Sequence, residues 1–91
     1  MTLRQTLTIV NQRGLHARAS AKFVGAVAAL PDGTAVRVAK DGLEAAGGSI
    51  LGLMMLGAAR GDQIEVMVEG GDEAAAMDQL AALVTGGFGE E

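Results

Sequence analysis

The stretch Gln63-Ile64-Glu65-Val66-Met67-Val68-Glu69 carries the clearest strand signal in the chain. Apolar side chains recur at every second position, at Ile64, Val66 and Val68. This period of two places them on one face of a sheet and predicts a half-buried strand. The next residues, Gly70-Gly71-Asp72, are typical of a turn that ends in a helix N-cap. We therefore expect a strand followed directly by a helix.

The same reasoning, applied on both sides of this strand, predicts the other elements. Alternating apolar residues predict strands over 4–10, 34–39 and 43–46, the last at a sheet edge, and Asp41-Gly42 suits a primed hairpin turn. Apolar spacings of three and four predict helices over 17–30, 50–56 and about 73–85. We expect one α+β domain over residues 1–91, in the order βαββαβα, with helices on one face of a mainly antiparallel sheet and a mobile tail at 88–91. The side chains expected to face the core are Leu7, Ile9, Ala19, Phe23, Ala26, Val27, Leu30, Val36, Val38, Leu53, Leu56, Ile64, Val66, Val68, Met77, Leu80 and either Leu83 or Val84.

Composition argues against several classes of function. The net charge is −4 and aromatic residues make up 2%, so there is neither a basic stripe nor a stacking surface for nucleic acid. The chain has no cysteine and one histidine, so we expect no metal site and no cofactor. No segment has the pattern of a targeting signal or the length of a membrane span. We expect a cytoplasmic monomer that binds no membrane.

The histidine, His16, stands where a strand pattern gives way to a helix pattern. A helix start offers backbone N–H groups without intrahelical acceptors, and the helix dipole favours an anion there. A neutral imidazole is nucleophilic near neutral pH, and the Arg18 fork suits phosphate oxygens. Gly14 allows a sharp bend before the helix, and Ala17 and Ala19 leave its start open. From these residues alone, a phosphoryl-carrying histidine and a plain surface or capping histidine both stay open.

Two motifs resemble those of a known family. Gly14-Leu15-His16-Ala17-Arg18-Ala19 resembles the active-site signature of the HPr phosphocarriers, and Gly48-Ser49-Ile50-Leu51-Gly52-Leu53-Met54-Met55-Leu56 resembles their second signature, around a regulatory serine. The resemblance runs from Leu3 to about Phe88, and the two ends of the chain look similar to the nitrogen-related branch. One departure is Ala19, where the family usually has proline, which pre-sets helical geometry in a first turn.

The resemblance implies an open-faced β-sandwich whose four antiparallel strands lie in the order 1-4-2-3, covered on one face by three helices. It implies a bacterial phosphoryl carrier rather than a turnover enzyme. Nδ1 of His16 would accept a phosphoryl group from phospho-enzyme I, charged by phosphoenolpyruvate, and pass it to a IIA-type protein, as in sugar transport. Arg18 would be a phosphate ligand, together with the backbone N–H groups of Ala17 and Arg18.

Ser49 and the segment after it carry two further expectations. Ser49 is placed to cap the helix that follows, and the resemblance also makes it a target for an HPr kinase/phosphorylase. A short helix has one buried stripe, which we assign to Leu53 and Leu56. At least two of the remaining large apolar side chains should then be exposed beside His16 as a docking patch for several partners. These are Ile50, Leu51, Met54 and Met55.

Three functions remain open at this point. The first is the phosphocarrier. The second is a regulatory binding module that signals by the phosphorylation state of His16 or Ser49 without sugar transport. The third, an α+β domain with no site, leaves the coincidence of two motifs unexplained.

Overall fold

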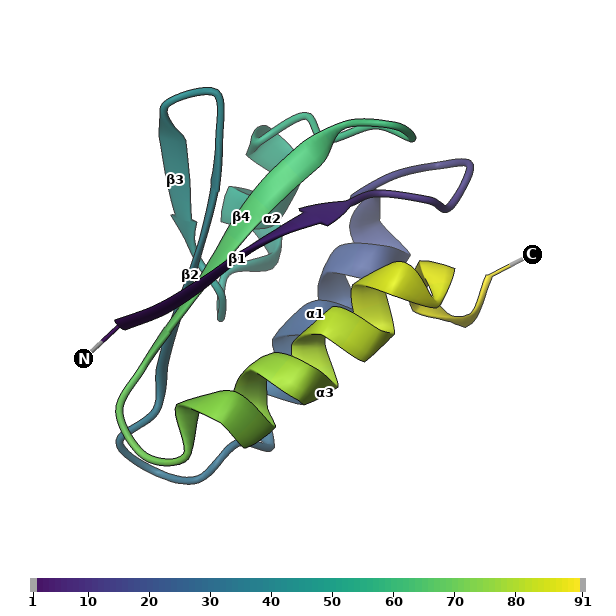
Figure 1. Cartoon of the computed structure of the whole chain (residues 1–91). Coiled ribbons are helices and arrows are strands. Elements are labelled where there is room, and N and C mark those ends of the chain that lie inside the picture. Colours follow the sequence, from purple (N-terminus) through teal and green to yellow (C-terminus); the bar gives the residue numbers. More distant parts are fainter. Residues whose placement is uncertain (1, 91) are drawn as a thin grey trace.

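The computed structural model describes residues 2–90, in which strands and helices follow one another in the order βαββαβα (Figure 1). The strands are β1 (Thr2–Thr8), β2 (Ala35–Lys40), β3 (Leu43–Ala46) and β4 (Gln63–Glu69). The helices are α1 (Ala17–Ala28), α2 (Ile50–Met55) and α3 (Glu73–Thr85), and a short 3₁₀ turn, Gly87–Gly89, follows α3. No helix within residues 2–90 is long and apolar enough to cross a membrane.

The strands form one antiparallel sheet in the order β1-β4-β2-β3, as the family resemblance implied. The strongest strand pattern of the sequence, β4, therefore lies inside the sheet, where Val66 pairs with Gln5 on one side and Val38 on the other. The hairpin between β2 and β3 turns at Asp41 and Gly42, with φ values of 52° and 84°. Two successive positive φ values are those of the expected primed turn.

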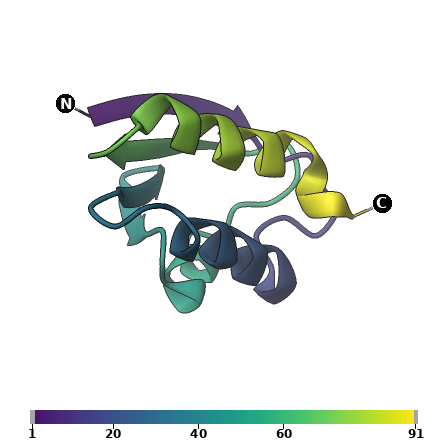
Figure 2. The ribbon, with the colours of Figure 1, turned by 90° about the horizontal axis from the view of Figure 1, so that it is seen from below.

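The three helices cover one face of the sheet (Figures 1 and 2). α3 packs on β1 and β4, α2 packs on β3, and α1 contacts both α2 and α3. Phe23 of α1 and Leu53 of α2 are each 1% exposed, and Leu80 of α3 is fully buried, so the helices share a single core with the inward side chains of the sheet. Of the two candidates near the end of α3, Val84 is buried and Leu83 is half-buried.

The predicted boundaries differ from the observed ones by at most two residues. β1 is two residues earlier than expected because its register is set by pairing with β4, in which Thr2 lies opposite Glu69. Ile9, beyond the end of β1, is nevertheless buried, and its backbone bonds to Asp62 and Gly61. α1 ends at Ala28, two residues early.

The prediction of a mobile C-terminal tail is wrong over residues 88–90, and Glu91 lies outside the described residues. Phe88 is 1% exposed and belongs to the core. The chain turns back on itself there, with hydrogen bonds from Gly89 N–H to Gly86 O and from Glu90 N–H to Gly87 O. The buried Phe88 ring stabilises this turn by removing apolar surface from water, which the neighbouring glycines cannot do.

Candidate functional site

Two features of the loop between β1 and α1 fix the position of His16. Gly14 has a φ of +63°, and a Cβ there would lie 2.3 Å from the backbone oxygen of Ala58. Glycine is therefore required both by the left-handed backbone and by the close approach of the two chain segments. Leu15 N–H then donates to the same Ala58 oxygen at 2.9 Å, which leaves His16 as the N-cap residue of α1.

The imidazole ring of His16 is held at both nitrogens. Arg18 N–H, in the first turn of α1, donates to Nδ1 at 3.3 Å, and Nε2 lies 2.7 Å from Oε2 of Glu90. The histidine side chain is 15% exposed and that of Glu90 is 16% exposed. His16 thus occupies the helix start that its sequence position predicted, in a specific orientation.

Two positively charged side chains of α1, Arg18 and Lys22, are held differently in the described residues. Arg18 is exposed, and no carboxylate of residues 2–90 lies within 4.0 Å of it. Lys22, one turn further along α1, donates from Nζ to the backbone oxygen of Phe88 at 2.6 Å. The side chain of Ala19 is fully buried and faces the core, whereas Ala17 is exposed. The Arg18 fork is thus available to a ligand at the helix start.

Glu90 is the residue of this site that the sequence did not indicate. The 3₁₀ turn after α3 brings the chain back towards the start of α1 (Figure 1). There Asn11 Nδ2 donates to Glu90 Oε1 at 3.1 Å. Partial burial raises the pKa of Glu90. Hydrogen bonds from Asn11 and His16, with the positive charges of Lys22 and of His16 when protonated, outweigh burial and lower the pKa below its ordinary value of 4.5. Glu90 is therefore an ionised carboxylate at neutral pH.

Ser49 and the apolar residues after it lie on α2, which packs beside α1. Ser49 is the N-cap of α2, because its Oγ accepts from Gly52 N–H at 2.9 Å. Leu53 and Leu56 are buried as expected. The other four large apolar side chains of α2 are all exposed, and we call them the α2 patch. They are Ile50 (42%), Leu51 (67%), Met54 (40%) and Met55 (71%).

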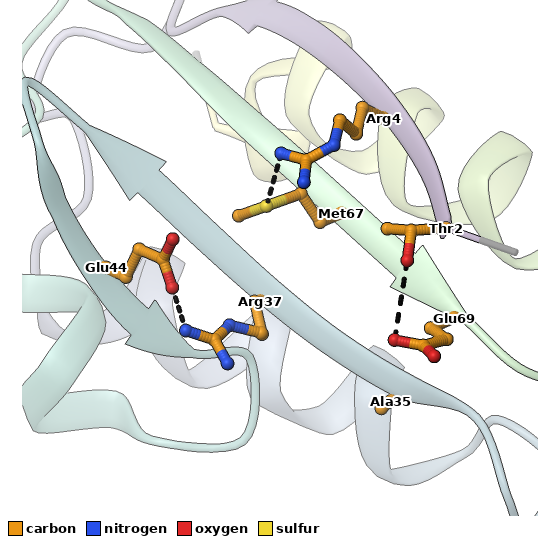
Figure 3. A pocket seen from close by; sticks show the side chains of 7 residues that line it. All are labelled: Thr2, Arg4, Ala35, Arg37, Glu44, Met67 and Glu69. Atoms are coloured by element: carbon orange, nitrogen blue, oxygen red, sulfur yellow. Dashed lines mark hydrogen bonds and ion pairs between the residues drawn. The ribbon is translucent and has the colours of Figure 1, made fainter.

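The face of the sheet that carries no helix has a shallow hollow of about 200 Å³ (Figure 3). It is lined by Thr2, Arg4, Ala35, Arg37, Glu44, Met67 and Glu69. Both arginines are paired with carboxylates of neighbouring strands, Arg4 with Glu65 and Arg37 with Glu44. Arg4 also covers Met67, with Nη1 3.2 Å from Sδ. Since alternate residues of β4 face opposite sides, this hollow lies across the sheet from the helices and is separate from the His16 site.

Comparison with known proteins identifies the family. Residues 3–86 match the family model described as "PTS HPr component phosphorylation site", where PTS denotes the phosphotransferase system. The chain belongs to the HPr phosphocarrier family. It is 47% identical over 88 residues to phosphocarrier protein HPr of Neisseria meningitidis serogroup A, covering 97% of each chain. It is 36% identical over 91 residues to phosphocarrier protein NPr of Escherichia coli K12, covering 100% of both.

Solved structures agree with this membership. The chain superimposes on HPr from Thermoanaerobacter tengcongensis with a TM-score of 0.89 at 36% identity, covering 98% of each chain. It also matches HPr from Bacillus anthracis, with a TM-score of 0.84 at 30% identity, covering 91% of this chain and 96% of the other. Membership confirms the open-faced fold and the phosphotransferase-system class that the two motifs implied.

Proposed function

We propose that His16 accepts a phosphoryl group at Nδ1 from phospho-enzyme I and passes it to a IIA-type protein, as a cytoplasmic phosphoenolpyruvate-dependent carrier. The observation that carries the proposal is the position of Nδ1, 3.3 Å from the Arg18 backbone nitrogen in the first turn of α1. A phosphoryl group on this atom would meet the N–H groups and the positive dipole end of a helix of 12 residues. These groups are in place before the reaction, so Arg18 N–H has only to exchange Nδ1 for a phosphoryl oxygen as its acceptor.

Arg18 would bind the phosphoryl oxygens from the solvent side. Its guanidinium is exposed and unpaired within residues 2–90, so binding a phosphate would break no existing ion pair. Two parallel N–H donors fit two phosphate oxygens, a geometry that a lysine ammonium cannot reproduce. The N–H groups of Ala17 and Arg18 would supply the backbone ligands.

The α2 patch would be the docking surface for enzyme I and for the acceptor protein. Its four side chains are between 40% and 71% exposed, and they lie on a helix that packs beside α1. Methionine adapts its shape to different partners, which suits a carrier that meets a donor and an acceptor in turn. Because the chain carries a net charge of −4, apolar contact rather than charge attraction would provide most of the affinity.

Ser49 would regulate this docking if an HPr kinase/phosphorylase modifies it. A phosphate at the N-cap is favoured by the dipole of α2, so the fold should tolerate it, yet it adds about two negative charges beside the α2 patch. We therefore expect Ser49→Asp to weaken the binding of enzyme I without lowering the melting temperature, and calorimetry can measure both quantities. The control is Ser49→Asn, which retains an uncharged cap. Equal affinities of the two variants would contradict this role.

Regulation without sugar transport is the alternative function, and it uses the same His16 and Ser49.

The transfer reaction tests the proposal. Incubation with enzyme I and phosphoenolpyruvate should give one acid-labile, base-stable phosphate per chain, and none in His16→Ala. Ser49→Ala is the matched control, because it removes the other phosphorylatable residue of the two motifs and should label normally. Labelling of His16→Ala to the wild-type extent would refute the proposal.

A further inference from the structure

The C-terminal turn carries a carboxylate to the far side of the His16 ring. α3 returns the chain to the start of α1 (Figures 1 and 2). Phe88 follows α3 and is buried, with a φ of 58°. Lys22 anchors the turn through its 2.6 Å bond to the Phe88 oxygen. Glu90 follows directly, and its side chain is 16% exposed, so the carboxylate is held in place against the ring.

The two hydrogen-bond partners of the His16 ring, Glu90 Oε2 and Arg18 N–H, select one tautomer of the ring. A carboxylate only accepts hydrogen bonds, so the nitrogen that faces Glu90 Oε2, Nε2, must carry the hydrogen. A backbone N–H only donates, so Nδ1, which faces Arg18 N–H, must present its lone pair. The two contacts, one from Glu90 and one from Arg18, both favour the tautomer with its hydrogen on Nε2.

We propose that Glu90 is a positioning residue for phosphoryl transfer, which keeps the hydrogen on Nε2 so that Nδ1 is the reacting nitrogen. This inference rests on the proposed function of His16. The carboxylate has a second effect after the reaction, because its charge stabilises the positive ring that phosphorylation creates. An acidic side chain that orients a histidine and stabilises its cation has the same effect in hydrolase triads.

The transfer step balances without any movement of a proton. The Nδ1 lone pair attacks phosphorus, the bond between phosphorus and the donor breaks, and its electron pair stays on the donor. The ring keeps its hydrogen on Nε2 and gains one positive charge, which faces Glu90 Oε2. When the group moves on, the electron pair of the N–P bond returns to Nδ1 and restores the original tautomer.

A carboxylate is required at position 90 because both of its partners there are donors. Asn11 Nδ2 donates to Oε1, and His16 Nε2 donates to Oε2. A glutamine of the same size has one acceptor oxygen for these two donors, so one donor would face an amide NH₂ group. Hydrogen bonds from Asn11 and His16 lower the pKa of Glu90 against the effect of burial, which keeps the carboxylate ionised at neutral pH.

Nitrogen NMR of the ring tests the proposal on the unphosphorylated protein. In the neutral ring, wild-type His16 should have a pyrrole-like Nε2 and a pyridine-like Nδ1. Glu90→Gln and Glu90→Ala should both show a larger fraction of the tautomer with hydrogen on Nδ1 than wild type, although Arg18 N–H still favours a lone pair on that atom. Glu65→Gln is the matched control: it removes an exposed carboxylate from the sheet without touching His16, and should leave the ring unchanged.

The second readout is the equilibrium of phosphoryl transfer from phospho-enzyme I. We expect Glu90→Gln to lower the fraction of phosphorylated chain at equilibrium, with a loss of about tenfold in the equilibrium constant, as for loss of a charged hydrogen bond. An unchanged tautomer in both Glu90 variants would overturn the proposal, and so would a changed tautomer with an unchanged equilibrium. Failure of wild-type His16 to label would instead refute the proposed function, since the tautomer is measured without phosphate.

Discussion

Replacing Gly14 by alanine should destabilise the fold and displace His16. At a φ of +63° any Cβ costs about 1 kcal/mol, through the clash that disfavours left-handed backbone. The new Cβ would also lie 2.3 Å from Ala58 O and 2.9 Å from Ala59 Cα, closer than carbon and backbone atoms approach. The two segments must separate, which weakens the Leu15–Ala58 hydrogen bond, worth roughly 1 kcal/mol, and loosens the packing of buried Ala58. We expect a total loss of about 3 kcal/mol in the free energy of unfolding.

Gly57→Ala is the matched control for this prediction. Gly57 has a φ of +67°, close to that of Gly14, but a Cβ there meets nothing within 4 Å. It should therefore show only the backbone cost of about 1 kcal/mol. Urea denaturation of both variants with unchanged m-values would measure the two losses, and Gly14→Ala should also melt about 15 °C below wild type. Equal destabilisation by the two substitutions would refute the close-approach argument.

Three further predictions concern the site. Arg18→Ala should slow phosphoryl transfer and change the free energy of unfolding by no more than about 0.5 kcal/mol, and Arg18→Lys should restore part of the rate. Arg4→Ala, on the opposite face of the sheet, is the control and should transfer at the normal rate. Parallel losses of rate and stability in Arg18→Ala would show that Arg18 is structural. Leu51→Ala should weaken the binding of enzyme I about tenfold in surface plasmon resonance, mainly through faster dissociation. Leu3→Ala is the control and should leave the affinity unchanged. Equal losses of affinity in the two variants would exclude docking on α2. Because the folded-state pKa of Glu90 is lowered, its carboxylate stabilises the fold above its ordinary pKa of 4.5, and this contribution disappears as pH falls through the folded-state value. Urea midpoints of wild type and Glu90→Gln should thus differ at neutral pH and converge in acid; a constant difference would contradict this linkage.

The sequence was informative wherever local patterns determine structure. The alternation in 63–69 predicted β4 to the residue, and Ser49 and Asp72 cap α2 and α3 as expected. The exposure of the α2 patch also followed from a local argument, since one helix of six residues cannot bury every apolar side chain it carries. Strand ends were predicted less well because pairing across the sheet sets them, as in the two-residue shift of β1.

The contact between His16 and Glu90 could not be predicted from local patterns because 74 positions separate the two residues. It depends on the 13 residues of α3, which span about 20 Å, and on the turn at Phe88 that ends beside the loop before α1. A glycine-rich segment with one aromatic residue resembles a loose tail in composition. Phe88 is buried by the packing of helices on the sheet, which a local sequence pattern does not report.

The most direct measurement is the location of the phosphate on the ring. After labelling by enzyme I and phosphoenolpyruvate, nitrogen–phosphorus coupling in the ¹⁵N-histidine protein reports which nitrogen is bonded to phosphorus. We expect coupling at Nδ1 of His16, with the hydrogen still on Nε2 facing Glu90. Phosphate on Nε2, or on any residue other than His16, would contradict the claim that the start of α1 is the phosphoryl site.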